Sequence, residues 1–239
     1  MAEQKLPTVA VLAGGLATRL YPVTRAIPKS LVEVANKPFV FHQLELLRSS
    51  GFCLVVLCVG YLGEMIQAVV GNGDSFGMQI EYSFDGPKLL GTGGALKKAL
   101  PLLGDEFFVL YGDSYLECDY QDVYHAFLQC HRSALMTVSH NKHRWDASNV
   151  MFDRGVVERY DKRNPTPEME YIDFGLGIFK RAVFESVSDD EPTDLADIYH
   201  ELADQRQLAG YVAKQRFYEI GSPKGLMETR QYLSSKSSR

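Results

Sequence analysis

The chain has 239 residues, a length that suits one large domain or a main domain with a subordinate lobe. Hydrophobic residues make up 46% and charged residues 23% of the sequence, a balance typical of a globular protein with a sizeable core. The formal net charge of -5 argues against nucleic acid as a partner, because binding to a phosphate backbone usually needs a basic surface.

The lack of targeting segments and the cysteine usage both indicate a cytoplasmic protein. No stretch approaches the ~18 continuous apolar residues of a membrane span, and the N-terminus lacks the basic start and long apolar middle of a signal peptide. The four cysteines form no CxxC pair. Cys53 and Cys58 lie in the apolar run FCLVVLCVGY and are predicted to be buried, reduced thiols, which suits a reducing compartment. We therefore expect a cytoplasmic protein with no membrane partner.

Short apolar runs alternate with segments of helical periodicity along the first half of the chain. Alternation of this kind indicates β-α-β units and a mostly parallel sheet with helices on both faces. In chain order, the pattern predicts a strand at 8–13, a helix at 38–50, a strand at 53–60, a helix at 61–70, a strand at 78–84, a helix at 93–103, a strand at 106–113 and a helix at 121–132.

The second half continues without a flexible linker, an internal repeat or a low-complexity tract, so we expect a single domain over 1–239. The predicted fold class is a three-layer α/β/α, Rossmann-like, mixed but mostly parallel sheet. The loops at Gly14 and Asp113 both follow strands and should meet at the carboxyl-end rim, where such sheets bind ligands. Further strands are expected at 134–140, 149–153, 156–161 and 171–180, and helices near 194–206 and 223–233.

The loop after the first strand combines bare backbone with two cations. Gly14 and Gly15 would let phosphate oxygens approach their N–H groups, while Arg19 offers a planar fork and Lys29 a point charge. The pattern is neither a Walker A loop nor G-x-G-x-x-G. A glycine pair alone indicates a tight turn as readily as a phosphate site, so the order of the neighbouring residues decides between them.

That order resembles the sugar-phosphate nucleotidyltransferase family, whose pattern is roughly L-A-G-G-x-G-T-R-L, then P-K-x-L, then x-x-K-P. This chain has LAGGLATRL at 12–20, PKSL at 28–31 and NKP at 36–38. Ala17 departs from the pattern, which usually has glycine there. The resemblance implies the GT-A-like fold of nucleotide-diphospho-sugar transferases, with a nucleotide-binding half at about 1–115 and a sugar-phosphate-binding half at about 116–239.

Five later segments resemble the same family in the same order. They are LLGTGGALKKAL (89–100), VLYGDSYL (109–116), RYDKRN (159–164), YIDFGLGIF (171–179) and FYEIGSPKGLMETRQYL (217–233). Two departures stand out: Asp173 replaces an asparagine common in relatives, and Glu219 replaces an aspartate.

The resemblance also implies roles for individual residues in the reaction of an NTP with a sugar 1-phosphate to give an NDP-sugar and pyrophosphate. Lys162, Asp173 and Gly175 would contact the sugar phosphate, and Asn149, near the single tryptophan Trp145, is a further candidate for the sugar pocket. Mg²⁺ would bind Asp113 and Glu219. Arg19 and Lys29 would be catalytic, and nucleotide contacts are expected from Leu12, Ala13, Gly14, Gly15, Thr18, Gly91, Thr92 and Gly93.

Several alternatives remain open from the sequence. The compact form most resembles bacterial enzymes that make GDP-activated mannose or heptose. The second alternative is an enzyme that transfers a uridylyl or thymidylyl group to a glucose- or muramic-type phosphate. A non-catalytic regulatory paralogue on the same fold is a second class. A glycosyltransferase would usually need an Asp-x-Asp motif, and here Ser114-Tyr115 follow Asp113. The end of the chain soon after 217–233 suggests a single activity, and homo-oligomers are possible.

Overall fold

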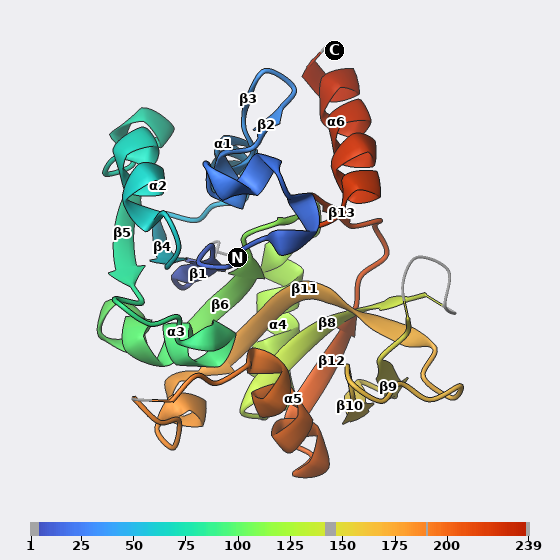
Figure 1. The fold of residues 1–239 in the computed structure, drawn as a ribbon. Helices are drawn as coiled ribbons and strands as arrows, with labels where there is room; N and C mark the ends of the chain where they lie inside the picture. Colours follow the sequence, from blue (N-terminus) through green and yellow to red (C-terminus); the bar gives the residue numbers. More distant parts are fainter. Residues whose placement is uncertain (1–4, 142–146, 190, 238–239) are drawn as a thin grey trace.

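A nine-stranded mixed sheet forms the centre of the computed structural model, which describes residues 5–141, 147–189 and 191–237 (Figure 1). Within these residues only β10 and β11 run against the direction of the other seven strands. The predicted mixed, mostly parallel sheet is therefore confirmed. The strand order is β5 (Gln79–Phe84), β4 (Leu54–Val59), β1 (Val9–Leu12), β6 (Glu106–Tyr111), β11 (Tyr171–Lys180), β8 (Ala134–His140), β12 (Leu208–Val212), β10 (Val156–Tyr160) and β9 (Val150–Asp153).

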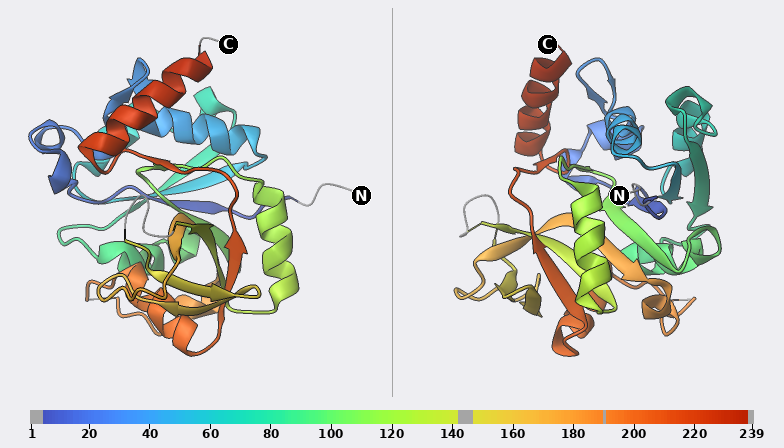
Figure 2. Two further views of the ribbon diagram at one scale, coloured as in Figure 1. Left: turned by 90° about the vertical axis from the view of Figure 1, so that its right-hand side faces the viewer. Right: turned by 180° about the vertical axis from the view of Figure 1, so that it is seen from behind.

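Helices cover both faces of the sheet and make the three layers (Figure 2). On one face α1 (Phe39–Ser49), α2 (Gly63–Val70) and α4 (Tyr120–Cys130) pack into a core with Val9 and Val11. On the other face α3 (Gly91–Ala99) and α5 (Leu195–Asp204) pack with Ala10. Strand β1 thus contributes alternate side chains to the two cores, as the period of two in a strand requires.

The sequences of the helices show where two of them begin and which face of α5 packs on the sheet. In α5 the buried residues recur three and four positions apart, which gives one apolar stripe toward the core. Asp194 caps this helix, since its side chain accepts a hydrogen bond from Ala196 N at 3.0 Å. Asp119 caps α4 in the same way, accepting from Asp122 N at 2.9 Å.

The four parallel strands β5, β4, β1 and β6 end side by side at one rim of the sheet. Their register pairs Leu12 with both Cys58 and Tyr111. The residues that follow these strands therefore lie side by side along the rim. Gly112 N donates to Leu12 O at 3.0 Å, a close approach that leaves no room for a Cβ on the glycine. The prediction that the loops at Gly14 and Asp113 meet is confirmed.

A β-bulge interrupts β11 where it crosses this rim. The pairing of β11 with β8 shifts between Asp173 and Gly177, and Gly175 inside the shifted stretch has a φ of +99°. Bulges of this kind redirect side chains out of the regular ladder. Here the bulge places Asp173 and Gly175 on the wall of a cavity.

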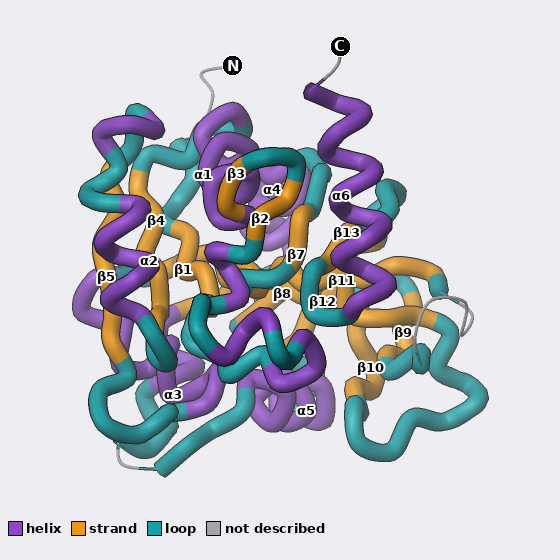
Figure 3. Tube along the Cα trace, turned by 45° about the horizontal axis from the view of Figure 1, so that its top comes forward, coloured by secondary structure: helices purple, strands orange, loops and turns teal. Residues whose placement is uncertain are grey.

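A third, smaller core joins the C-terminal helix α6 (Pro223–Ser237) to the hairpin of β2 (Glu33–Val34) and β3 (Lys37–Pro38). Figure 3 shows the helix beside this hairpin. The two-residue strands β7 (Ser114–Tyr115) and β13 (Tyr218–Glu219) pair antiparallel beneath it. Ile220 N donates to Asp113 O at 2.9 Å. This pairing brings Glu219, more than 100 residues away in sequence, next to the end of β6.

Three details differ from the sequence expectations. Strand β12 was not predicted, because its LAGYV run is short, begins soon after the end of α5 and contains Gly210. The predicted helix at 93–103 ends at Ala99 and continues as the 3-10 turn Leu100–Leu102, which contains a proline. The prediction that Cys53 is buried is wrong: it lies exposed directly before β4, whereas Cys58 is buried.

Candidate active site

Two cavities open at the rim and share the wall formed by Tyr111 and Asp113. The smaller, of about 220 Å³, is lined only by residues from the first half of the chain. The larger, of about 490 Å³, is lined mainly by residues from the second half, with Arg19 reaching it from the first. Asp113 therefore stands where the contents of the two cavities would meet.

The glycine loop after β1 forms one side of the smaller cavity. Gly14 packs against the backbone of Gly60, where a Cβ would lie 2.9 Å from Gly60 N, so only glycine fits this contact. Of the residues predicted to bind nucleotide, Thr18 and Gly93 are absent from the described lining. The others line it together with Lys29: Leu12, Ala13, Gly14, Gly15, Gly91 and Thr92.

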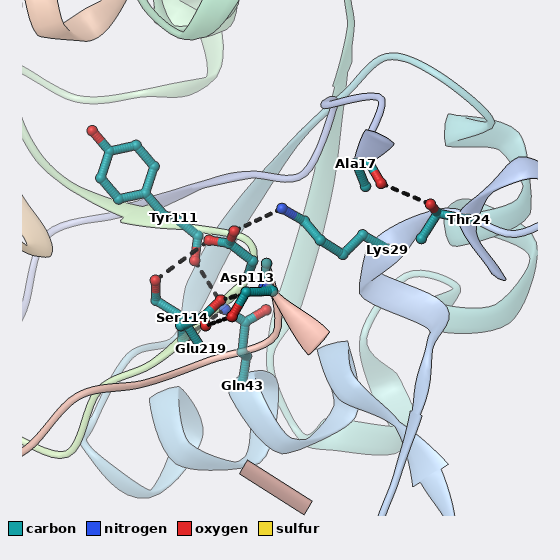
Figure 4. Close-up of polar contacts among 10 residues, drawn as sticks. Ala17, Thr24, Lys29, Gln43, Tyr111, Asp113, Ser114 and Glu219 are labelled. Atoms are coloured by element: carbon teal, nitrogen blue, oxygen red, sulfur yellow. Dashed lines mark hydrogen bonds and ion pairs between the residues drawn. The ribbon is translucent and has the colours of Figure 1, made fainter. Parts of the chain in front are cut away.

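Lys29 and Asp113 form an ion pair at the junction of the cavities, with Lys29 Nζ 2.6 Å from Asp113 Oδ2 (Figure 4). Both side chains keep about a quarter of their surface exposed, at 22% and 26%, so a ligand can reach them. Gln43 fixes the backbone beneath the pair, because its Nε2 donates to Tyr111 O at 3.1 Å and to Ser114 O at 2.7 Å. The backbone that carries Asp113 is thus fixed, and the acid in turn holds the Lys29 amine.

Ala17 occupies the position where the family pattern usually has glycine, and it adopts a left-handed conformation with a φ of +51°. A non-glycine residue is strained there. Thr24, which is buried, donates its hydroxyl to Ala17 O at 2.8 Å and helps to hold the loop in this conformation (Figure 4). The alanine therefore preserves the loop geometry at some cost in stability.

The second glycine segment begins α3 and is tied to the start of α5. Gly93 N donates to Thr193 O at 2.8 Å, and the Thr92 hydroxyl donates to Asp194 Oδ1 at 2.8 Å while accepting from Leu195 N at 2.7 Å. The Gly93 N–H and the Thr92 hydroxyl are therefore already hydrogen-bonded within the protein. Of this segment, Gly91 and Thr92 line the smaller cavity.

Four cations and four carboxylates line the larger cavity. Lys162 and Asp173 were expected from the sequence, whereas Lys224 in the first turn of α6 and Arg216 were missed. The position of Lys224 directly after the GSP segment could have signalled it. The charged lining residues are Arg19, Asp113, Lys162, Asp173, Arg216, Glu219, Lys224 and Glu228.

Asp173 lies on the wall of the larger cavity within a hydrogen-bond network. Its Oδ1 accepts from Gly175 N at 2.8 Å, and its Oδ2 accepts a long bond of 3.5 Å from the Tyr111 hydroxyl. Its own N–H donates to Asn149 Oδ1 at 3.2 Å, which places Asn149 in the same wall. Burial raises the pKa of Asp173 to about 6, against the opposing effects of the Gly175 N–H and the Lys162 charge. Trp145 lies outside the described residues.

Glu219 faces the start of α6. Its Oε2 accepts from the backbone N–H groups of Gly221 and of Ser222, the latter at 3.0 Å, and its Oε1 accepts from Ser222 Oγ at 2.5 Å. Asp113 Oδ2 and Glu219 Oε2 both lie within 3.0 Å of the point that a Cβ on Gly221 would occupy, so at most twice that distance separates them. Among the described residues no third acid, histidine or cysteine completes a metal-binding cluster with them.

Asp85 is a further residue of the smaller cavity that the sequence interpretation missed. It is buried, with 8% of its surface exposed, and burial raises the pKa of its carboxyl group, against the opposing effects of the Leu90 N–H and the Lys98 charge. A signal was available, because Asp85 directly follows β5, and side chains that follow parallel strands meet at the ligand-binding rim.

Comparison with known proteins identifies the family. The model of the family described as "Nucleotidyl transferase" matches residues 8–236. The chain belongs to the nucleotidyl transferase family. The crystal structure of HddC from Yersinia pseudotuberculosis shares the fold of this nucleotidyl transferase, with a TM-score of 0.79, 23% identity and coverage of 95% of this chain and 100% of that one.

Curated relatives of this nucleotidyl transferase include two sugar-phosphate enzymes. A mannose-1-phosphate guanyltransferase from Gibberella zeae is 29% identical over 94% of this chain and 64% of its own length. A UTP–glucose-1-phosphate uridylyltransferase from Synechocystis is 30% identical over 81% of this chain and 54% of its own length. The chain thus spans less than two thirds of these relatives. In the part of the chain that the structure describes, no helix is both long and apolar enough to span a bilayer.

Replacing Asp173 with asparagine should change how stability depends on pH. The folded state holds the carboxyl proton up to about pH 6, whereas the unfolded chain releases it near 3.8, so the free energy of unfolding falls as the pH rises through this window. Asp173→Asn lacks this loss and should be more stable by about 3 kcal/mol at neutral pH, with a smaller gain at about pH 4. Urea unfolding across this range measures the gap; a gap that stays constant with pH would contradict the explanation.

Replacing Ala17 with glycine should relieve the strained turn. Ala17→Gly removes the Cβ from a left-handed residue and should raise the free energy of unfolding by about 1 kcal/mol. Thermal and urea unfolding measure the change. Ala126→Gly in helix α4 is the matched control and should lower stability by about 1 kcal/mol, because glycine disfavours a helix. A loss of stability in Ala17→Gly would show that the turn is not strained.

Proposed function

We propose that this protein transfers a nucleotidyl group from an NTP to a sugar 1-phosphate, forming an NDP-sugar and pyrophosphate. The observation that carries the proposal is the Lys29–Asp113 pair at the junction of two cavities, one lined by glycine backbone and the other by cations. Two substrates bound in separate cavities would bring their phosphates together at this point. Family membership and the fold support the same conclusion.

The smaller cavity is suited to the nucleotide. The loop at Gly14 and Gly15 leaves backbone accessible to phosphate oxygens, and Lys29 adds a positive charge beside it. The apolar surface of Leu12, Ala13 and the neighbouring residues suits the flat face of a base. Residues of about 1–115 would thus form the nucleotide-binding half.

The larger cavity is suited to a sugar phosphate. Lys162 and Arg19 would hold the phosphate, while Asp173, Asn149 and Gly175 offer hydrogen-bonding groups for sugar hydroxyls. Most of these residues come from about 116–239, the proposed sugar-phosphate-binding half. Arg19 is the exception, and its place between the halves suits contact with phosphates of both substrates.

The chemistry needs positioning and charge neutralisation more than acid–base catalysis. An oxygen of the sugar phosphate, already ionised at neutral pH, attacks the α-phosphorus of the NTP. The bond from this phosphorus to the bridging oxygen breaks, and pyrophosphate leaves with the electron pair. Lys29 and Arg19 would stabilise the negative charge that develops on the transferred and leaving phosphates.

The acids at the junction fit a divalent cation. Asp113 and Glu219 present carboxylate oxygens near one point at Gly221, and hard oxygen ligands are the ones that Mg²⁺ prefers. Two protein carboxylates with substrate phosphates are a usual ligand set for this ion. Bound Mg²⁺ would neutralise phosphate charge at the reacting centre. Lys29 is the residue that balances Asp113 in the described structure.

Guanylyl transfer to a mannose- or heptose-type 1-phosphate is the preferred substrate assignment, supported by the mannose-1-phosphate guanyltransferase relative. Uridylyl or thymidylyl transfer to a glucose- or muramic-type phosphate is the alternative. The uridylyltransferase relative supports the uridylyl version of this alternative. A non-catalytic paralogue would be expected to lose its site charges, and here Arg19, Lys29 and Asp113 are all present. A cytoplasmic location and a homo-oligomer stay predictions.

A matrix of substrates tests the proposed activity. Pyrophosphate release is measured with Mg²⁺ while ATP, GTP, CTP, UTP and dTTP are each combined with glucose, mannose, N-acetylglucosamine, N-acetylmuramic acid and heptose 1-phosphates. One strong combination is expected, with GTP and mannose or heptose 1-phosphate. No release from folded protein that also fails to bind any NTP would favour the non-catalytic paralogue.

Removal of the Lys29 amine should abolish most of the turnover while the fold persists. Lys29→Ala deletes a partly exposed cation at the reacting centre and should lower kcat by about 100- to 1,000-fold. Lys37→Ala is the matched control, because it also breaks a lysine–carboxylate pair, with Glu45, on the surface. Steady-state kinetics and thermal melting of both variants are compared with the wild type. A near-normal kcat in Lys29→Ala would remove this residue from the mechanism.

A further inference from the structure

A buried carboxylate stands at the opposite end of the smaller cavity from Lys29. Asp85 follows β5, the edge strand, while Asp113 follows β6, three strands away in the order β5-β4-β1-β6. Neighbouring strands lie about 4.8 Å apart, so about 14 Å of rim separates the two acids. A nucleoside phosphate, with its base at one end and its phosphates at the other, suits this length.

The acceptor capacity of Asp85 is largely unused within the protein. Among the described residues, its carboxylate accepts only one hydrogen bond, a long one of 3.3 Å from Leu90 N to Oδ2. The nearby Lys98 donates to the backbone oxygen of Asp85 at 2.9 Å. Asp85 as a residue is only 8% exposed, yet its carboxylate is not among the buried atoms that lack a partner, so the free acceptor capacity is reachable from the cavity. A ligand that brings N–H donors into the cavity could therefore use it.

The walls around this carboxylate are apolar. Leu12, Cys58, Leu89 and Ala95 line the same cavity, and Leu89 remains 37% exposed at its edge. Burial raises the pKa of the Cys58 thiol to about 12, so this wall stays uncharged. Apolar walls with one acceptor at the end match a flat heterocycle that carries donors on its edge.

Glycine at position 60 makes this arrangement possible. A Cβ there would lie 2.9 Å from Asp85 Oδ2, 2.8 Å from Leu89 Cδ2 and 2.9 Å from Gly14 O. The carboxylate, the apolar wall and the phosphate loop therefore converge on one residue without a side chain. This convergence connects Asp85 to the loop that is proposed to hold the nucleotide.

We propose that Asp85 recognises the edge of the nucleobase and selects guanine. The inference rests on the proposed function, since it assumes that the smaller cavity holds the nucleotide. An ionised carboxylate only accepts hydrogen bonds, and its two oxygens match two parallel N–H donors. Guanine offers such a pair, N1–H and one N–H of its 2-amino group, on adjacent atoms.

The other bases match this acceptor less well. Uracil and thymine present one N–H between two carbonyl oxygens, and those oxygens would face the carboxylate. Adenine and cytosine present an amino group beside a ring nitrogen that is itself an acceptor. Each of these bases would leave one carboxylate oxygen opposite another acceptor in a buried place, which is unfavourable.

The first test measures binding of GTP, ITP, UTP, dTTP and ATP to the wild-type protein by calorimetry with Mg²⁺. ITP keeps N1–H but lacks the 2-amino group. GTP should bind about 10- to 100-fold more tightly than the others, with ITP losing about 10-fold. Tighter binding of UTP or dTTP than of GTP, or equal binding of GTP and ITP, would overturn the proposal. This test needs no variant and no turnover.

The second test uses Asp85→Asn, whose amide offers one acceptor and one donor. Its affinity for GTP should fall by about 10- to 100-fold, while its affinity for UTP stays the same or rises. Glu64→Gln is the control, because it removes the charge of an exposed acid in α2. It should leave the affinities for all of the NTPs unchanged. An equal loss for every NTP in Asp85→Asn would indicate a structural role and contradict base selection.

The two proposals fail in distinguishable ways. Preferential binding of GTP without pyrophosphate release from any combination would leave the role of Asp85 standing and refute nucleotidyl transfer. Pyrophosphate release with UTP or dTTP in preference to GTP would support nucleotidyl transfer and refute guanine selection by Asp85.

Discussion

The ion pair between Lys29 and Asp113 is the constraint on which the rest of the site depends. It stands where two cavities meet, and each partner comes from a loop that follows a strand or turn at the rim. Neither group is deeply buried, so the pair contributes little to stability compared with its effect on ligands. Gln43, inside α1, holds the backbone on both sides of Asp113 and so fixes where the charge lies.

The change in strand direction at β11 explains why there are two cavities. From β5 to β6 the strands are parallel, and their carboxyl ends open into one continuous rim. Antiparallel β11 then enters from the other side, and its bulge at Asp173 to Gly177 forms the wall of the larger cavity. Tyr111, at the end of β6, faces both spaces, and its hydroxyl reaches Asp173.

Local sequence patterns predicted most of the fold and part of the site. The apolar runs and glycine stops located most strands, and the strand-end rule placed Gly14 and Asp113 on one rim, because both signals are local. The pairing of β13 with β7 is a long-range contact, so only the family resemblance indicated that Glu219 lies near Asp113. The ties of Thr92 and Gly93 to the Thr193 segment also join distant parts of the chain and left no local signal.

The charges along the rim are arranged by distance from the junction, and this order favours one orientation of a nucleotide. Asp85 at the β5 end repels phosphate but accepts base donors, whereas Lys29 at the β6 end attracts phosphate. Arg19 and Lys162 extend the positive charge into the larger cavity. A nucleotide bound the other way round would place its phosphates against a buried carboxylate. The same two side chains therefore discriminate between orientations as well as between ligands, which a uniformly basic pocket could not do.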